Sequence, residues 1–396
     1  MTRHRYLTQN IIEDLKEKMV FLSGPRQVGK TTISTDIIGK IYYPGNYSYY
    51  SWDKKQDRAA ILHSRWADTR LIILDEFHKY KKWKTLLKGE YDTLKSHKQF
   101  LITGSARLDT YRKGGDSLQG RYHSYRVHPF SLSELNEHYP RVQLFDKENR
   151  LLPLRFSGNS QHLDTLLKFG GFPEPLLTQS DTHLRRWHKQ RIDRFFREDV
   201  RDMTRVMDLD NMRLLGDLLP DKVGSLLSLN TLREDLEVSH RAINSWMKAL
   251  ESFYYHFRIY PYQTKRVRAL KKEPKLYMWD WSEVKDIGAR FENLIVSHLL
   301  KLIHYLQDYE GYDVELHFLR DKDKREVDFL VTVDKKPWFC VEAKLKKDGV
   351  PKSLSYFKEK LQIPYAYLVT YEDTSDYTDK DGVKVLPASK FLTALP

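Results

Sequence analysis

The chain has 396 residues, which is long for a single hydrophobic core and favours two to four domains. Hydrophobic residues make up 40% of the sequence, so the chain can bury real cores and does not have a disordered composition. The formal charge of +13 favours a polyanionic partner, nucleic acid ahead of a membrane surface. Cys340 is the one cysteine, which excludes an internal disulfide or a cysteine zinc site and predicts a core position.

The first 18 residues are charged throughout and lack the apolar centre of a signal peptide. No apolar run approaches the roughly 18 residues that a membrane span requires. We therefore expect a cytoplasmic protein with no membrane partner.

The segment MVFLSGPRQVGKTTISTDII, residues 19–38, reads as a strand, a glycine-rich loop and a helix. The spacing of Gly24, Gly29, Lys30 and Thr31 is a full phosphate-loop signature, and the flanking strand and helix argue against a chance turn. Backbone N–H groups of such a loop wrap phosphates, the lysine reaches β and γ oxygens, and the threonine hydroxyl binds Mg²⁺. We expect ATP to bind the consecutive residues Gly24, Pro25, Arg26, Gln27, Val28, Gly29, Lys30, Thr31 and Thr32.

Two further strands are expected to end beside this loop. RLIILDEFHK ends in Asp75, which would hold Mg²⁺ together with Thr31, and Glu76, which would activate the attacking water. An ordinary strand end with solvated acids is the alternative. KQFLITGSAR ends near Ser105, which would position that water. Arg121, or else Arg107, is a candidate transition-state arginine, acting in its own chain or in a neighbour, unless it is a surface arginine.

These segments resemble a known family. SGPRQVGKTT, LIILDEFHKYKKWKTLLK, LITGSARL, SLQGR and HPFSLSEL occur in the order seen in predicted AAA+-type ATPases of bacteria and archaea with a C-terminal domain of unknown function. FGGFPEPLL, FFREDVRD, EPKLYMWD, GARFENLIVSHLL, EVDFLV and VEAKL also look like that family, so the resemblance covers nearly the whole chain. It implies a P-loop ATPase fold and a homo-oligomer, because an arginine supplied in trans needs a neighbour.

The middle of the chain is predicted to be helical and then to form a winged helix. Helices over residues 161–203, broken at GGFPEP, stand where AAA+-like proteins carry a lid. Two helices then follow, 229–236 and 240–253, with Ser239 as the N-cap of the second, and strands YYHFRIYPY and KLYMWD would form the wing. The wing is basic, and we expect it to contact DNA phosphates while Arg241, Asn244 and Lys248 face a groove. Its basic residues are Arg258, Lys265, Arg266, Arg268, Lys271, Lys272 and Lys275. The alternative is a rigid spacer.

The last segment places acids inside apolar strands. A helix with Glu292 precedes three strands, of which the second carries Asp328 and the third Glu342 and Lys344. This pattern resembles the PD-(D/E)xK nuclease fold, although Val327 stands where the motif names proline. Glu292, Asp328 and Glu342 would bind Mg²⁺, and Lys344 would stabilise the transition state. A salt-bridged structural cluster is the alternative.

Together these segments predict an α/β protein with a P-loop AAA+-like core (1–155), a helical lid (156–207), a winged helix (208–281) and a PD-(D/E)xK nuclease-like domain (282–396). The leading hypothesis is an ATP-hydrolysing, Mg²⁺-dependent protein that acts on duplex or branched DNA without reading its sequence, and whose last domain holds or cuts that DNA. Two alternatives stay open: a DNA-remodelling or branch-migration motor with a non-cleaving clamp, and an ATP-dependent signalling switch with a silent nuclease fold.

Overall fold

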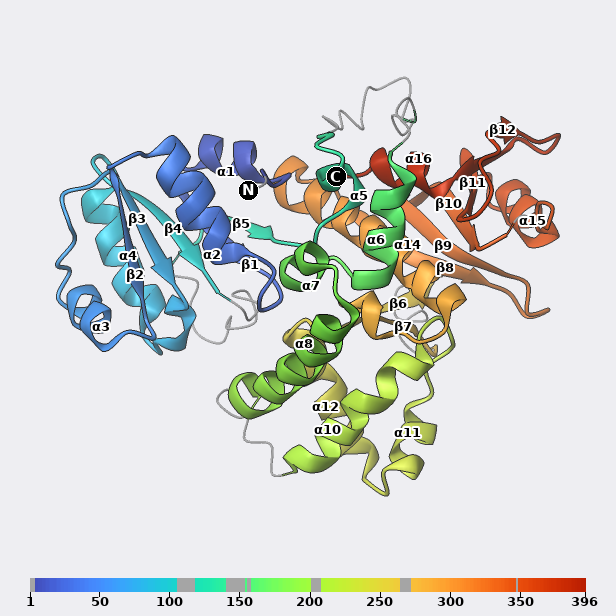
Figure 1. The fold of residues 1–396 in the computed structure, drawn as a ribbon, viewed down its shortest axis with the longest axis horizontal. Helices are drawn as coiled ribbons and strands as arrows, with labels where there is room; N and C mark the ends of the chain where they lie inside the picture. The colour runs from blue at the N-terminus through green and yellow to red at the C-terminus, as the bar shows by residue number, and fades with distance from the viewer. Residues whose placement is uncertain are drawn as a thin grey trace. The chain divides into compact units, whose positions relative to one another are not determined.

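The structure is a computed structural model that describes residues 4–104, 118–139, 154, 158–200, 208–263, 272–346 and 348–396. The chain divides into two compact units, Met1–His128 and Pro129–Pro396. Each unit has its own β-sheet with helices packed against it (Figure 1), which confirms the predicted α/β class. The division falls at residue 128 and not at 155, and the predicted lid, winged-helix and C-terminal segments all lie in the second unit.

The first unit contains a five-stranded parallel sheet in the order β2-β3-β4-β1-β5. Every residue of β1, β3 and β4 is buried, as expected for central strands covered by helices on both faces. The elements are α1 (Thr8–Asp14), β1 (Met19–Ser23), α2 (Lys30–Thr32), η1 (Ile33–Tyr42), β2 (Tyr47–Ser51), α3 (Lys55–Leu62), β3 (Leu71–Asp75), η2 (Phe77–Lys79), α4 (Trp83–Leu94), β4 (Gln99–Thr103) and β5 (Tyr122–Arg126).

The second unit begins with helices. They are α5 (Leu132–Leu135), α6 (Ser160–Phe169), α7 (Pro173–Thr178), α8 (Asp181–Arg194), η3 (Phe195–Val200), α10 (Leu209–Leu218), η4 (Leu219–Lys222), α11 (Leu229–Asp235) and α12 (His240–Ser252). The sequence prediction for α11 and α12 is confirmed, and Ser239 caps α12 by accepting the Ala242 N–H at 3.2 Å.

An eight-stranded sheet, in the order β12-β13-β11-β10-β9-β8-β6-β7, follows in the same unit. Its remaining elements are β6 (His256–Pro261), β7 (Lys275–Met278), η5 (Trp281–Glu283), α14 (Ile287–Tyr305), η6 (Leu306–Glu310), β8 (Val314–Arg320), β9 (Glu326–Val333), β10 (Lys336–Lys344), α15 (Lys352–Lys360), β11 (Tyr365–Thr370), β12 (Tyr377–Thr378), β13 (Val383–Pro387) and α16 (Ala388–Thr393). Each predicted strand and the predicted helix over α14 are confirmed, and Cys340 is buried within β10.

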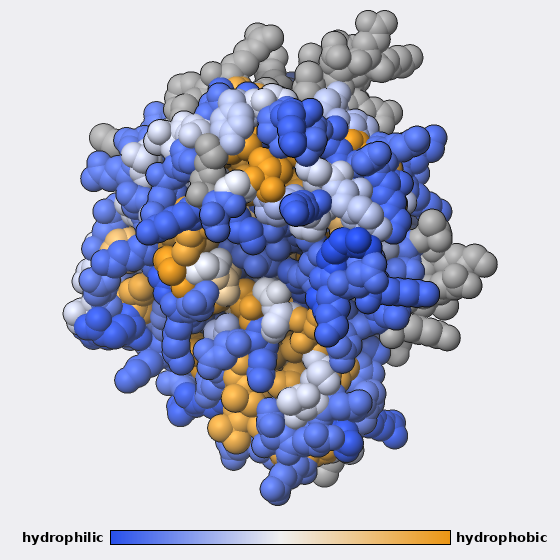
Figure 2. Space-filling model, turned by 90° about the vertical axis from the view of Figure 1, so that its right-hand side faces the viewer, coloured by the Kyte–Doolittle hydropathy of each residue, from blue (hydrophilic) through white to orange (hydrophobic). Residues whose placement is uncertain are grey.

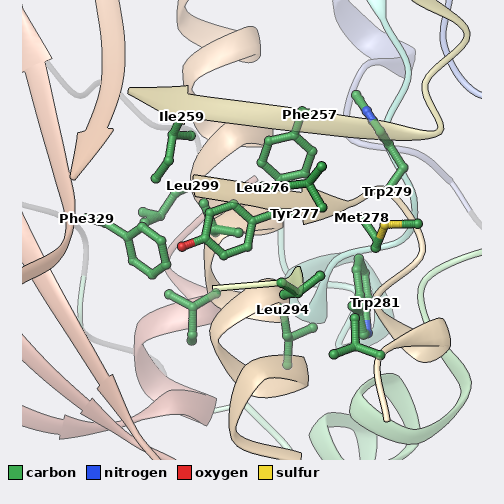
Figure 3. Packing of buried hydrophobic residues seen from close by; sticks show 14 of the residues in the cluster. Phe257, Ile259, Leu276, Tyr277, Met278, Trp279, Trp281, Leu294, Leu299 and Phe329 are labelled. Atoms are coloured by element: carbon green, nitrogen blue, oxygen red, sulfur yellow. The ribbon is translucent and has the colours of Figure 1, made fainter. Parts of the chain in front are cut away.

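The hairpin β6–β7 is part of this large sheet. Strand β6 pairs with β7 on one side and runs parallel to β8 on the other, through Tyr260 and His317. The predicted wing therefore packs with the C-terminal strands in one core, where Phe257, Tyr277 and Phe329 lie together over α14 (Figure 3). Strand β6 therefore has a hydrogen-bonded neighbour on each side, β7 and β8, and leaves no edge unpaired where they meet it.

The face shown in Figure 2 is mostly hydrophilic, with hydrophobic side chains visible between the polar ones. Among the described residues no helix is both long and apolar enough to cross a membrane.

Candidate nucleotide and carboxylate sites

The loop of residues 24–29 connects β1 to α2 and depends on its glycines. Gly24 has a φ of 146° and Gly29 a φ of 96°, conformations that side chains rarely tolerate. A Cβ on Gly24 would also lie 2.4 Å from the carbonyl oxygen of Val127. The backbone therefore curls tightly between strand and helix, as a phosphate-binding loop must.

Lys30 lies buried inside this loop. Its Nζ donates hydrogen bonds to the carbonyl oxygens of Gly24, at 3.0 Å, and Pro25, at 2.7 Å. The ammonium is thus held where the loop backbone converges, which is the place for a phosphate oxygen in a phosphate loop. The predicted contact of Lys30 with β and γ oxygens fits this position.

Asp75 ends β3 directly beside the loop. Its carboxylate accepts hydrogen bonds from Thr31 Oγ1 at 3.1 Å and Tyr49 Oη at 2.7 Å, and from the Thr103 hydroxyl. The parallel register places Asp75 level with Thr103 on β4, so the carboxyl ends of the strands meet at one edge. A carboxylate and a hydroxyl so close together are suitable oxygen ligands for Mg²⁺, so these residues fit that ion.

Glu76 follows in a left-handed conformation, with φ of 54°, which is uncommon for a residue other than glycine. Its Oε2 lies 3.5 Å from Lys79 Nζ and 3.7 Å from His78 Nε2, and the side chain is only partly exposed. Burial lowers the pKa of His78, so the glutamate has a neutral imidazole on one side and an ammonium on the other.

The other predicted residues of this site have different outcomes. Ser105 and Arg107 lie outside the described residues. Arg121 immediately precedes β5, and its carbonyl accepts the Met19 N–H, so it stands at the amino end of the strands, opposite the loop. Its guanidinium binds the Asp92 carboxylate at 2.8 and 3.0 Å. Arg121 therefore cannot complete the nucleotide site of its own chain, and a contribution to a neighbouring subunit stays a prediction.

The second site is a cluster of charges on β9 and β10. Ala343 N–H donates to Asp328 Oδ2 at 3.0 Å, Asp328 N–H lies 3.4 Å from Glu342 Oε2, and Lys344 Nζ lies 2.9 Å from Glu342 Oε1. The register of β8 against β9 shifts between His317 and Leu319, opposite Asp328. A bulge of this kind changes the direction of nearby side chains, and here it lies beside the acid in the apolar strand.

Residues from two other elements join this cluster. Glu292, on α14, accepts a 2.6 Å hydrogen bond from Tyr277 Oη on β7. Lys275, also on β7, has its Nζ 2.7 Å from Glu326 Oε1, 3.4 Å from Glu292 Oε1 and 3.7 Å from Asp328 Oδ1. The sequence analysis missed Tyr277 and Glu326 here, as it missed Tyr49 beside Asp75, because nothing local in the sequence marks these contacts.

Burial and the mutual proximity of the acids change their proton affinity. Burial, then the Asp328 charge, raises the pKa of Glu292 to about 7 and that of Glu342 to about 7. For Lys275, burial works against the charged form, but the carboxylates of Glu292, Asp328 and Glu326 outweigh it and raise the pKa above its ordinary value. The cluster is thus a mixed ionic network with a permanently charged lysine.

This geometry corrects the prediction of a basic wing for two of its residues. Lys275 is 2% exposed and faces carboxylates, and Arg258 is mostly buried with its Nη2 2.6 Å from Glu251 Oε2. Neither can contact DNA phosphates, because both charges are already neutralised inside the unit. Lys272 is exposed, whereas Lys265, Arg266, Arg268 and Lys271 lie outside the described residues.

The cluster in this form does not fit a metal ion. In the part of the chain that the structure describes, the one trio of potential ligand atoms within 4.8 Å of each other is His188, Asp280 and Glu283, not Glu292, Asp328 and Glu342. That trio is itself neutralised by Arg191, which lies 2.5 Å from Glu283 Oε1 and 3.6 Å from Asp280 Oδ2. The predicted ligands Glu292, Asp328 and Glu342 surround a lysine where the sequence predicted Mg²⁺.

A phosphate loop followed by an acidic strand end, on a parallel sheet, defines the first unit as a P-loop nucleotide domain of ATPase type. Family comparison agrees. Residues 16–136 match the family model described as an AAA domain, residues 160–284 match a domain of unknown function (DUF8612), and residues 287–391 match another (DUF4143).

Whole-chain relatives are distant. An uncharacterized protein of Methanocaldococcus jannaschii is 21% identical over 91% of this chain and 84% of its own length. An uncharacterized protein of Mycobacterium tuberculosis is 23% identical over 95% of this chain and 81% of its own.

Among solved structures, the Aeropyrum pernix ORC1 protein in complex with DNA is 14% identical, covering 74% of this chain and 92% of its own, at a TM-score of 0.34. The Thermotoga maritima RuvB Holliday junction branch migration motor is 17% identical. The match covers 63% of this chain and 87% of the RuvB chain, at a TM-score of 0.30. At such TM-scores these likenesses carry no argument about this chain.

Proposed function

We propose that this protein is an AAA+-type ATPase that acts on DNA and divides the work between its two units: the first unit hydrolyses ATP and the second unit holds DNA. The observation that carries the ATPase proposal is the hydrogen bond from Thr31 to Asp75, with Lys30 held inside the glycine-rich loop. These side chains come from β1–α2 and from β3, so a chance loop would not bring them together.

The chain's own residues account for binding and catalysis in the first unit. The loop backbone and Lys30 hold the ATP phosphates, while Thr31 and Asp75 would hold Mg²⁺, which supplies charge neutralisation at the phosphates. Glu76 accepts a proton from the attacking water, and it directly follows Asp75 at the end of β3. Ser105 and Arg121, the latter supplied to a neighbouring subunit of a homo-oligomer, are proposed to complete this site.

The second unit is proposed to contact DNA through α12. The apolar stripe of this helix, Ile243, Trp246, Met247 and Leu250, is buried, which leaves Arg241 and Lys248 exposed on the other side. Together with α11 and the hairpin β6–β7, this arrangement supports the winged-helix proposal. A net charge of +13 supports a polyanionic partner, and contacts of this kind bind phosphates without reading sequence.

The order of elements supports a nuclease-type fold for the last part of the second unit. Helix α14 leads into the antiparallel strands β8, β9 and β10, and then α15 leads into β11, which runs parallel to β10. We propose that this fold holds DNA without cutting it, because Lys275 fills the carboxylate cluster. The non-cleaving clamp is therefore favoured over metal-dependent cleavage.

One set of assays tests this function. ATP hydrolysis is measured with and without duplex, branched and single-stranded DNA, for wild type, Lys30→Ala, Arg241→Glu and Lys248→Glu. We expect DNA to stimulate hydrolysis by wild type, Lys30→Ala to be inactive, and the two helix variants to keep basal hydrolysis while losing stimulation. Basal hydrolysis without any response to DNA would instead support a signalling switch.

Strand cleavage is followed in the same reactions with Mg²⁺ or Mn²⁺, for wild type and Lys344→Ala. Intact DNA throughout agrees with a clamp. Cleavage by wild type that Lys344→Ala abolishes would contradict it and establish the nuclease activity that the sequence motif suggests.

A further inference from the structure

Lys275 is an unusual residue to find buried among three carboxylates. It comes from β7, fifty-three residues before Asp328 in the chain, and its ammonium lies within 3.7 Å of oxygens from Glu326, Glu292 and Asp328. The neighbouring pair Lys344–Glu342 and the contact of Arg320 with Glu326 provide the other positive charges. Three cations thus face four acids, so the cluster is nearly neutral without a metal ion.

The strand that carries Lys275 is fixed in the core. Asn293 on α14 holds the backbone of Met278, three residues after Lys275. It accepts the Met278 N–H at 2.8 Å and donates to the Met278 carbonyl at 2.9 Å. Tyr277 packs between Phe257 and Phe329, with ring centroids 5.8 and 5.9 Å away (Figure 3). This packing fixes the backbone of β7 beside the acids, and the Lys275 side chain, 2% exposed, lies buried among them.

Backbone of the segment before α11 lines one side of the cluster. Val223 and Leu226 form bridges to β7 at Leu276 and Lys275, and Gly224 lies against Glu292. A Cβ at Gly224 would stand 3.2 Å from Glu292 Oε2, and its φ of 75° also favours glycine. The backbone at Gly224 therefore approaches the Glu292 carboxylate closely on this side of the cluster.

We propose that Lys275 is the resident cation of this cluster: its ammonium takes the place of a divalent metal between Glu292 and Asp328, and removing its charge creates a divalent-cation site. A fixed ammonium repels a divalent ion at the same place, while the acids it leaves behind are oxygen ligands of the kind that Mg²⁺ and Mn²⁺ prefer. The inference goes beyond the proposed function, since it concerns metal binding and holds whether or not the protein acts on DNA.

The test is a titration of the full chain with Mn²⁺, followed by calorimetry and by the electron paramagnetic resonance of the free ion. All proteins carry Asp75→Ala and contain no nucleotide, so that the first unit contributes no Mn²⁺ site. The variants are Lys275→Met, Lys275→Arg and, as a matched control, Lys272→Met at an exposed lysine nearby. Thermal unfolding monitors whether each variant is folded.

We expect Lys275→Met to bind one Mn²⁺ at least tenfold more tightly than the parent, and the added change Glu292→Gln or Asp328→Asn to abolish that gain. Lys275→Arg and Lys272→Met should behave like the parent. A folded Lys275→Met that gains no affinity would overturn the proposal.

The parent protein gives a second, independent reading in case Lys275→Met does not fold. Mn²⁺ binding by the parent that is lost in Asp328→Asn would show that the metal coexists with Lys275, and would equally overturn the proposal. Since no DNA or ATP is present, neither result depends on the outcome of the ATPase and cleavage assays.

Discussion

Thr31 Oγ1 donates a 3.1 Å hydrogen bond to Asp75 Oδ2, which joins the first turn after the phosphate loop to the end of a different strand. The two oxygens are the predicted Mg²⁺ ligands of the nucleotide site. Their contact means that the fold itself arranges the ligands. Strand β4 pairs in parallel with both β1 and β3, which places the loop after β1 near the end of β3.

Asp75→Asn and Thr31→Ala should each lower kcat for ATP hydrolysis by at least about 100-fold, because the metal contributes several kcal/mol to stabilising phosphoryl transfer. Steady-state hydrolysis over a range of Mg²⁺ concentrations measures this. Thr35→Ala, one helical turn further on and half-buried, is the control and should stay within about twofold of wild type. Undiminished hydrolysis by Asp75→Asn would disprove the metal role.

Tyr49 is predicted to position Asp75. Its hydroxyl donates to Asp75 Oδ2 at 2.7 Å, so Tyr49→Phe should leave the carboxylate less well oriented. The Mg²⁺ concentration needed for half-maximal hydrolysis should then rise by roughly tenfold. The readout is the Mg²⁺ concentration for half-maximal hydrolysis, measured alongside KM for ATP, which should change little.

The matched control for Tyr49 is Tyr50→Phe, because the Tyr50 hydroxyl accepts the Ala67 N–H and does not touch Asp75. Equal effects of the two substitutions would show that Tyr49 matters only for stability.

Lys301 and Glu134 form a buried ion pair in the second unit, with Nζ 2.5 Å from Oε2, and both side chains are almost fully inaccessible. Lys301→Met should cost about 3–5 kcal/mol of unfolding free energy, because it leaves Glu134 buried without its counter-charge. Adding Glu134→Gln should recover much of that loss. Denaturant unfolding measures both.

The exposed pair Lys285–Asp221 is the comparison for this ion pair, with Lys285→Met expected to cost less than about 1 kcal/mol. A similar small cost for Lys301→Met would contradict the interpretation.

His298 should make stability depend on pH. Its Nε2 accepts the Leu132 N–H at 3.1 Å, its Nδ1 donates to the Leu294 carbonyl at 2.9 Å, and burial lowers its pKa to about 3. Since the folded pKa lies below the ordinary value of 6.5, the unfolded chain binds the proton more readily. The stability that this histidine contributes is complete above pH 6.5 and is lost as the pH falls toward 3.

The measurement compares wild type with His298→Gln in urea at pH 7 and at pH 5. The advantage of wild type should shrink by roughly 2 kcal/mol at the lower pH. Other buried histidines such as His256 are present in both proteins and cancel. A difference between wild type and His298→Gln that is the same at pH 7 and pH 5 would refute the prediction.

Local patterns predicted most of the elements. The phosphate loop could be predicted because its residues are consecutive in the chain. Its backbone path depends on positive φ values at Gly24 and Gly29, which glycine adopts readily. The apolar runs of β8, β9 and β10 and the Ser239 cap of α12 are likewise local, and the structure has each of them. The spacing of Glu342 and Lys344 was enough to predict that their side chains meet.

The residues that sequence reasoning placed wrongly are those whose partners are distant in the chain. Lys275 and Arg258 were counted as a basic wing because the residues around them are basic, yet both are buried in ion pairs. Arg121 immediately precedes β5 at the amino end of the strands, so of its two predicted roles only the one in a neighbouring subunit stays a prediction. Residue type gives a charge, but only the packing of strands decides what that charge faces.

By itself, the sequence determined the α/β class, the phosphate loop and the acidic strand that follows it, because each depends on residues a few positions apart. Only the tertiary structure decided that Tyr49 and Thr103 hold Asp75, and that Lys275 lies between Glu292 and Asp328. The physical reason is that a buried charge takes whichever partner the fold brings within a few ångströms, and the pairing of β6 with β8 brings that lysine to the acids.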